Sequence, residues 1–307
     1  MSTFEEFSYQ SSTGRNMIHA LKCVPSGNVK GVVQIVHGIA ECIDRYRDFM
    51  AFLAEHGYAC FGEDHLGHGK TARNEEEKGA FCEEDGWGHV VSDLATLHDL
   101  ASAQFPGVRY IMFGHSMGSF LTRTYIAKYP DKYDAAIISG TGHQAGIVVW
   151  AGNLIGSRTV KKNGYASDGS GMNKLAMGSY LKRIENPKTP CDWLSRDEEL
   201  VAKYVADPSC GFVCKAGLYN DMMQGLAIIT SMKTINQVSK DKPIYFMSGA
   251  DDPVGDYGKG VKKAYECFKK AGIKDVTMKL YEGGRHEMLN EINKAEVYAD
   301  ILAWLEK

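Results

Sequence analysis

A serine lies between two glycines in Gly114-His115-Ser116-Met117-Gly118. The apolar run at residues 110–113 before it predicts a buried strand over 109–113, and the residues after it are typical of a helix. A serine hydroxyl reaches a carbonyl carbon only if it stands clear of the backbone, and small residues two before and two after permit the required sharp turn. Such a string also arises by chance around an inert serine, but its place between strand and helix favours a nucleophilic Ser116.

An acid and an imidazole follow two later predicted strands. Asp251 and Asp252 come after residues 244–248, and His286 comes after residues 276–281. The carboxyl ends of such strands meet at one edge of an open α/β sheet, so these groups are expected to converge on the serine in the order Ser, Asp, His. Neutral His286 would take the serine proton, while the Asp would orient the imidazole. Asp252 is favoured over Asp251 because a following proline keeps its backbone extended.

Two backbone amides are predicted to stabilise a developing oxyanion. Met117 starts the helix after the serine, where N–H groups lack intrahelical partners. Ile39 follows the predicted strand 31–36 and supplies the second amide. His37, beside it, is interpreted as a structural hydrogen-bonding group in preference to a second catalytic imidazole.

Composition narrows the function classes. The 307 residues contain 35 Lys+Arg and 38 Asp+Glu, a net charge of −3, which argues against nucleic-acid binding. Eight scattered cysteines indicate reduced thiols and a cytoplasmic protein. The acidic start has no signal-peptide pattern, and the most apolar run spans about eight residues where a membrane-spanning helix needs about 20.

The order of elements predicts an α/β fold with a mostly parallel central sheet and helices on both faces. Helical spacing recurs at 90–101 and 261–268, and Asn293 with Glu296 resembles a capping box for a last helix. Residues 7–10 and 17–24 predict a hairpin. Buried strands are expected at residues 31–36, 58–62, 109–113, 135–139, 244–248 and 276–281.

One gap is too long for this pattern. About 100 residues separate the strands ending at 139 and starting at 244, where a strand-helix-strand unit needs about 30. We predict a core of residues 1–142 and 216–307, with residues 143–215, hereafter the insertion, forming a helical cap. Its side chains are expected to line a substrate pocket, or to form the cap's own core: Ile147, Val148, Val149, Trp150, Met172 and Met177, joined by Met222 and Met223.

Other chemistry is not indicated. The loop 64–69 contains Asp64, His65 and His68, but its glycines suit a turn and no further ligand completes a zinc set. Cys210 and Cys214 are interpreted as two buried thiols. No GxGxxG or Walker pattern is present, so neither a metal nor a nucleotide cofactor is expected.

Together the motifs resemble the α/β-hydrolase superfamily, in its monoacylglycerol lipase and lysophospholipase branch (serine aminopeptidase S33 type). The similar segments are His37–Glu41 with Arg45-Tyr46, the loop 64–69, the serine turn and Gly284–Glu287. The resemblance implies a serine hydrolase of carboxylic esters with Ser116, Asp252 and His286 as triad and the amides of Ile39 and Met117 as oxyanion hole. It also places Glu41 and Arg45 near the polar head of a glycerol ester. Alternatively, these two form an ion pair four residues apart.

The expected reaction is ester cleavage through an acyl-enzyme, on a monoacylglycerol, a lysophospholipid or a smaller ester. The same machinery hydrolyses amides, so an aminopeptidase is an alternative. A silent binding protein on this scaffold would usually lack a triad member. The expected partner is a small-molecule or lipid ester, with transient contact between the cap and a lipid surface.

Overall fold

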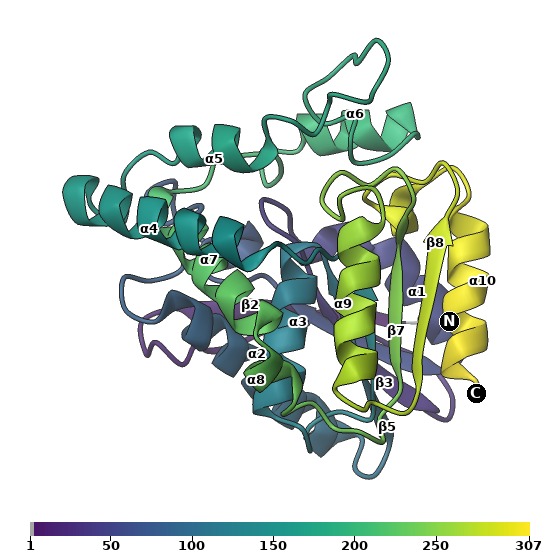
Figure 1. The fold of residues 1–307 in the computed structure, drawn as a ribbon. Coiled ribbons are helices and arrows are strands. Elements are labelled where there is room, and N and C mark those ends of the chain that lie inside the picture. Colours follow the sequence, from purple (N-terminus) through teal and green to yellow (C-terminus); the bar gives the residue numbers. More distant parts are fainter. Residues whose placement is uncertain (1–2) are drawn as a thin grey trace.

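The computed structural model describes residues 3–307 and contains one sheet of eight strands (Figure 1). The strand order is β1-β2-β4-β3-β5-β6-β7-β8. β1 and β2 form an antiparallel hairpin and β2 pairs antiparallel with β4, whereas the other neighbours are parallel. The strands are β1 (Thr3–Gln10), β2 (Met17–Val24), β3 (Gly31–Val36), β4 (Tyr58–Glu63), β5 (Arg109–His115), β6 (Ala135–Ser139), β7 (Ile244–Gly249) and β8 (Val276–Tyr281).

Both faces of the sheet are covered by helices, which confirms the predicted fold class. On β3, Val33 and Ile35 point into one apolar layer, while Val32 and Val36 point into the other. Successive side chains point to opposite faces, so a strand buried on both sides is largely apolar. The one polar side chain of β3, the buried Gln34, donates to the Leu94 carbonyl (3.1 Å) and accepts from the Tyr110 hydroxyl (2.6 Å). The first layer lies under α1 (Arg47–Glu55) and α10 (Lys294–Leu305), and the second under α2 (Gly86–Gln104), α3 (Met117–Lys128) and α9 (Lys259–Lys270).

The insertion lies between β6 and α7 and supplies three helices. They are α4 (Gly146–Asn163), α5 (Ser170–Met177) and α6 (Glu198–Ala206), followed by α7 (Ala216–Thr230) and α8 (Met232–Ile235). α4 packs along α7, and a Cβ at Gly156 would stand 2.8 Å from the amide oxygen of Asn220. Figure 1 shows α5 and α6 beyond the edge where the parallel strands end. The insertion therefore covers the edge at which Ser116, Asp252 and His286 were expected.

Short 3-10 helices complete the list, at η1 (Ile43–Tyr46), η2 (Gly69–Thr71) and η3 (Met288–Asn290). The last helix begins after Asn293 as expected, but the capping box was wrong. The Asn293 side chain donates to the Glu296 carboxylate (2.9 Å) and makes no cap bond to any backbone amide of the described residues. None of the helices within residues 3–307 has the length and apolar character needed to cross a bilayer.

Candidate active site

Ser116 lies in the turn between β5 and α3. Its φ of 54° is in the left-handed region, which is costly for a residue with a side chain. The two flanking glycines allow this turn, because a Cβ at Gly118 would lie 2.0 Å from the Val36 carbonyl oxygen and one at Gly114 would lie 2.3 Å from the Thr122 hydroxyl. The Gly-x-Ser-x-Gly spacing is therefore a packing requirement that leaves the serine at the start of α3.

Asp252 follows β7 and is fully buried, whereas its neighbour Asp251 is exposed. Its Oδ2 accepts hydrogen bonds from His286 Nδ1 (2.9 Å) and Ser248 Oγ (2.9 Å), and its Oδ1 accepts one from the Val254 amide (2.9 Å). Burial alone would raise the pKa of Asp252, but His286 and these donors outweigh it and lower the pKa. The geometry therefore selects Asp252 as the carboxylate paired with the imidazole.

His286 is oriented by this contact with Nε2 free to act. Burial disfavours its cation, but the Asp252 carboxylate outweighs burial and raises the pKa of His286 above its ordinary 6.5. The ring contacts those of His115 and Trp193, with centroid distances of 4.7 and 5.1 Å. Nε2 is buried and has no hydrogen-bond partner within residues 3–307, and both His286 and Ser116 line one cavity. In enzyme structures without substrate, the hydrogen bond between a catalytic serine and histidine is often long, and it shortens once substrate is bound.

The loop after β3 carries the expected oxyanion amide of Ile39. Ile39 lines both cavities that reach the serine, and Met117 is the first residue of α3. Ala40 holds the loop in a left-handed conformation (φ 52°). Its carbonyl accepts hydrogen bonds from the Tyr204 hydroxyl (2.9 Å) and the Gly211 amide (2.9 Å), both from the insertion. The insertion thus buttresses the loop that would hold the oxyanion.

A buried ionic network joins this loop to the histidine loop. Arg45 donates to Glu41 and forms a two-pronged contact with Glu287 (2.7 and 2.6 Å). Glu41 also accepts from the Gly38 amide and the Tyr46 hydroxyl (2.9 Å). The ion pair between Glu41 and Arg45, which was the alternative to a place at the glycerol head, is therefore present, and it braces two loops of the site.

Sequence reasoning missed the role of Glu287, whose partner Arg45 is 242 positions away. Burial raises the pKa of Glu287, but the Arg45 guanidinium prevails and holds the pKa at about 2. Glu287 follows His286 directly, so its place next to a predicted catalytic residue was the available signal. A buried carboxylate needs a partner charge.

Two cavities meet at Ser116, which lines both of them. One, of about 580 Å³, is apolar and runs between α4, α5, α3 and α7. The other, of about 460 Å³, contains the polar groups Glu41, His115 and His286 together with Tyr204. Residues that sequence reasoning missed in the apolar cavity come from core helices and the insertion: Phe120, Leu226, Tyr219, Tyr180 and Trp193.

Some of the residues predicted to line a pocket do so and others do not, depending on the face of the helix that carries them. Ile147, Val148 and the four predicted methionines line the apolar cavity. Val149 is buried elsewhere, and Trp150 is 62% exposed and lines neither cavity in the described part of the chain. At about 100° per residue, Ile147, Ala151 and Ile155 share one face of α4, whereas Trp150 points to another. The structure therefore does not bring Trp150 to the site.

The histidine-rich loop 64–69 supports the backbone. The His65 amide donates to His37 Nε2 (3.1 Å), and the two rings stack at 3.9 Å. Burial lowers the pKa of His65 to about 3 and that of His68 to about 4, so both are neutral. Asp64 accepts from the Ile43 amide (2.8 Å). These contacts agree with the structural interpretation of His37.

Comparison with known proteins matches residues 27–293 to the family described as serine aminopeptidase, S33. A monoacylglycerol lipase of Mycolicibacterium smegmatis is 27% identical over 99% of this chain and 98% of its own. Human monoglyceride lipase is 24% identical over 92% of this chain and 84% of its own. A carboxyl esterase from Bacillus coagulans, solved with glycerol, is 32% identical with a TM-score of 0.92, covering 99% of this chain and 98% of the esterase. The chain therefore belongs to the serine aminopeptidase S33 family of α/β-hydrolases, in the branch that includes monoacylglycerol lipases.

Proposed function

We propose that this protein hydrolyses monoacylglycerols through an acyl-enzyme on Ser116. The observation that carries the proposal is that Ser116 lines both an apolar cavity and a more polar one. The apolar cavity suits an acyl chain and the polar one suits the glycerol portion. The relatives named monoacylglycerol lipase support the same substrate class.

The proposed reaction follows from the hydrogen bonds of the site. His286 Nε2 takes the proton of Ser116 as the serine oxygen bonds to the ester carbon. The amides of Ile39 and Met117 stabilise the oxyanion, and His286 returns the proton to the departing glycerol oxygen. Water then attacks the acyl-serine by the same route, with the proton again passing through His286. Asp252 keeps a proton on Nδ1 throughout, so that Nε2 remains the acceptor.

An aminopeptidase is less well supported by the charges of the cavities. Such an enzyme would need an anionic group to bind a substrate ammonium. Of the residues described, the carboxylates that line either cavity are Glu41 and Glu287, and both are already bound to Arg45. The ester reaction needs no such group.

We further propose that residues 143–215 act as a cap that contacts aggregated lipid. Ile147 and Leu175 are 70% and 68% exposed while also bordering the apolar cavity, and Trp150, on another face of α4, is 62% exposed. Exposed apolar side chains at the mouth of a cavity would be removed from water by contact with a lipid surface, and substrate could pass from that surface into the cavity. The eight free thiols support a cytoplasmic setting.

The test is a panel of monoacylglycerols and p-nitrophenyl esters of rising chain length, beside lysophospholipids and aminoacyl amides. Each methylene buried in the apolar cavity contributes about 0.8 kcal/mol, so kcat/KM is expected to rise up to about fourfold per methylene until the cavity is filled. Ala151→Phe narrows that cavity and should lower the ratio of long-chain to short-chain turnover at least tenfold (about 1.4 kcal/mol). Trp150→Ala, outside the cavity, should leave the ratio for monomeric esters unchanged.

Ser116→Ala is the control for the nucleophile and should remove turnover of every ester, by about six orders of magnitude if the triad acts as a unit. Equal hydrolysis by the parent and Ser116→Ala would refute the mechanism. A preference for aminoacyl amides over all esters would refute the substrate class.

A further inference from the structure

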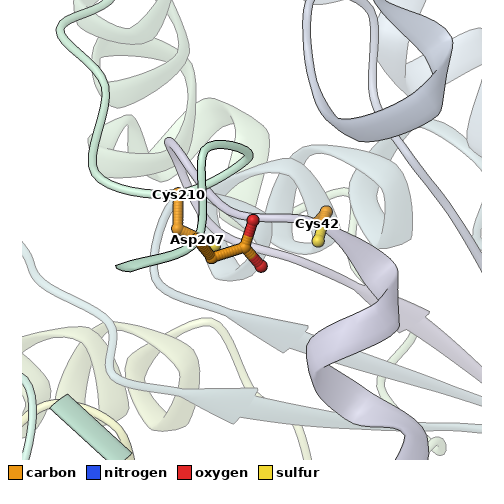
Figure 2. A group of neighbouring side chains, drawn as sticks. All are labelled: Cys42, Asp207 and Cys210. Carbon is orange, nitrogen blue, oxygen red and sulfur yellow. The ribbon is translucent and has the colours of Figure 1, made fainter. Parts of the chain in front are cut away.

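Two cysteines and an aspartate meet outside the triad. The sulfur atoms of Cys42 and Cys210 and a carboxylate oxygen of Asp207 all lie within 4.8 Å of one another. Figure 2 shows the Asp207 carboxylate pointing toward Cys42. Cys42 precedes η1 on the loop of the oxyanion amide, whereas Asp207 and Cys210 follow α6 in the insertion. The cluster therefore joins two parts of the fold that are distant in sequence.

The backbone holds these side chains in place independently of any ligand. The Cys210 amide donates to the Asp207 carbonyl (2.9 Å), and the Ser209 amide donates to Asp207 Oδ1 (2.8 Å). The next residue, Gly211, donates to the Ala40 carbonyl (2.9 Å), two residues before Cys42. The cluster is therefore preorganised, with little chain entropy left to lose when a ligand binds.

The positive charge near the two thiols is already paired with carboxylates. The hydrogen-bond contact with Cys42, together with burial, raises the pKa of Cys210 far above its ordinary value, although Arg45 opposes the shift. Neither sulfur lies in the triad, and the nearby Arg45 is already neutralised by Glu41 and Glu287. A cation at the cluster would therefore not face an unpaired positive charge.

We propose that Cys42, Asp207 and Cys210 bind a thiophilic divalent cation of the Zn²⁺ type. Zinc takes thiolates at about 2.3 Å and carboxylate oxygens at about 2.0–2.2 Å in a tetrahedral set, which the cluster reaches by closing its atoms slightly. Magnesium and calcium prefer all-oxygen ligands and do not suit two sulfurs. Cys42 and Cys210 are buried while Asp207 is partly exposed, so the carboxylate side supplies an entry path and room for water as fourth ligand.

Binding changes protonation and not oxidation state. Two S–H bonds break, two metal–sulfur bonds form, and two protons leave to solvent. The bound cation would cross-link the loop of Ile39 to the loop after α6. Because it binds only the folded chain, it would also raise the melting temperature. The proposal is independent of the reaction catalysed at Ser116.

The experiment uses the full chain, reduced and stripped with a chelator. Co²⁺ titration should produce a thiolate-to-cobalt charge-transfer band with tetrahedral visible bands, saturating at one ion per chain, and Zn²⁺ should displace it. Cys42→Ser and Cys210→Ser should each weaken binding at least about 100-fold. Asp207→Asn, at a partly exposed position, tests the carboxylate without removing a buried side chain. It should weaken binding at least about 10-fold.

Cys82→Ser provides the matched control, since Cys82 is a partly exposed thiol outside the cluster. It should leave the Co²⁺ spectrum and affinity unchanged. Absence of a thiolate band in the fully reduced protein would overturn the proposal. Co²⁺ affinity that is unchanged in Asp207→Asn and in both cluster cysteine variants would also overturn it. So would a loss of Co²⁺ affinity in Cys82→Ser as large as that in Cys42→Ser or Cys210→Ser.

Discussion

Replacing Asp252 by asparagine should change the tautomer of the neutral His286 ring, moving its proton from Nδ1 to Nε2. The Val254 amide donates to Oδ1, so this position must remain an oxygen, and the new NH₂ group takes the place of Oδ2. It then faces His286 Nδ1, which must become an acceptor, and the proton of the neutral ring moves to Nε2. The Ser248 hydroxyl accepts where it formerly donated, so the loop keeps its hydrogen bonds. The imidazole is then held in the wrong tautomer to receive the Ser116 proton.

The loss should be large, because the variant removes both the acceptor and the charge that stabilises the imidazolium. For the equivalent change in a serine protease triad, the loss in kcat is about 10⁴-fold. At about 1.36 kcal/mol per factor of ten, this corresponds to about 5 kcal/mol of transition-state stabilisation. Asp251→Asn is the matched control, since Asp251 is exposed and the carboxylate bonded to the imidazole is that of Asp252, and this variant should stay within about threefold of the parent.

The assay is kcat/KM for a p-nitrophenyl ester, with circular dichroism to show that both variants are folded. A fluorophosphonate titration would count reactive serines in the parent and in Asp251→Asn. Retention of activity within tenfold by a folded Asp252→Asn protein would refute the tautomer argument. A larger loss of kcat/KM in Asp251→Asn than in Asp252→Asn would identify Asp251 as the acid of the triad.

The acid limb of kcat/KM should lie above pH 6.5, because the pKa of His286 is raised and the protonated ring cannot accept the Ser116 proton. A profile over about pH 5–9 checks this, and a midpoint below 6.5 would contradict it. Arg45→Met should cost about 3–5 kcal/mol in the free energy of unfolding, because it leaves two buried carboxylates without their cation. Arg47→Met removes partly exposed ion pairs and the contact of the guanidinium with the Phe4 ring (5.0 Å), and should cost only about 1 kcal/mol. Similar losses of urea stability in the two variants would contradict the bracing role of Arg45.

The fold was accessible to sequence reasoning because its strands are buried on both faces. Such strands are nearly continuous apolar or β-branched runs, and the runs at residues 31–36 and 244–248 could be located without knowing their neighbours. The capping box at Asn293 failed because side chains near a helix start also bond to one another, and residue type does not distinguish these partners. The spacing of α4 identified apolar residues but not which of them face the cavity, so Ile147 and Trp150 were predicted together.

The sequence by itself determined the order of Ser116, Asp252 and His286 and the strand ends that carry them, because local periodicity and turn chemistry are encoded in neighbouring residues. Only the tertiary structure decided which distant charges and thiols meet. The contact of Arg45 with Glu287 and the cluster of Cys42 with Cys210 depend on how loops far apart in the chain pack over one edge of the sheet. Burial then changes what these groups do, since removing water makes each charge or thiol depend on the partner that packing places beside it.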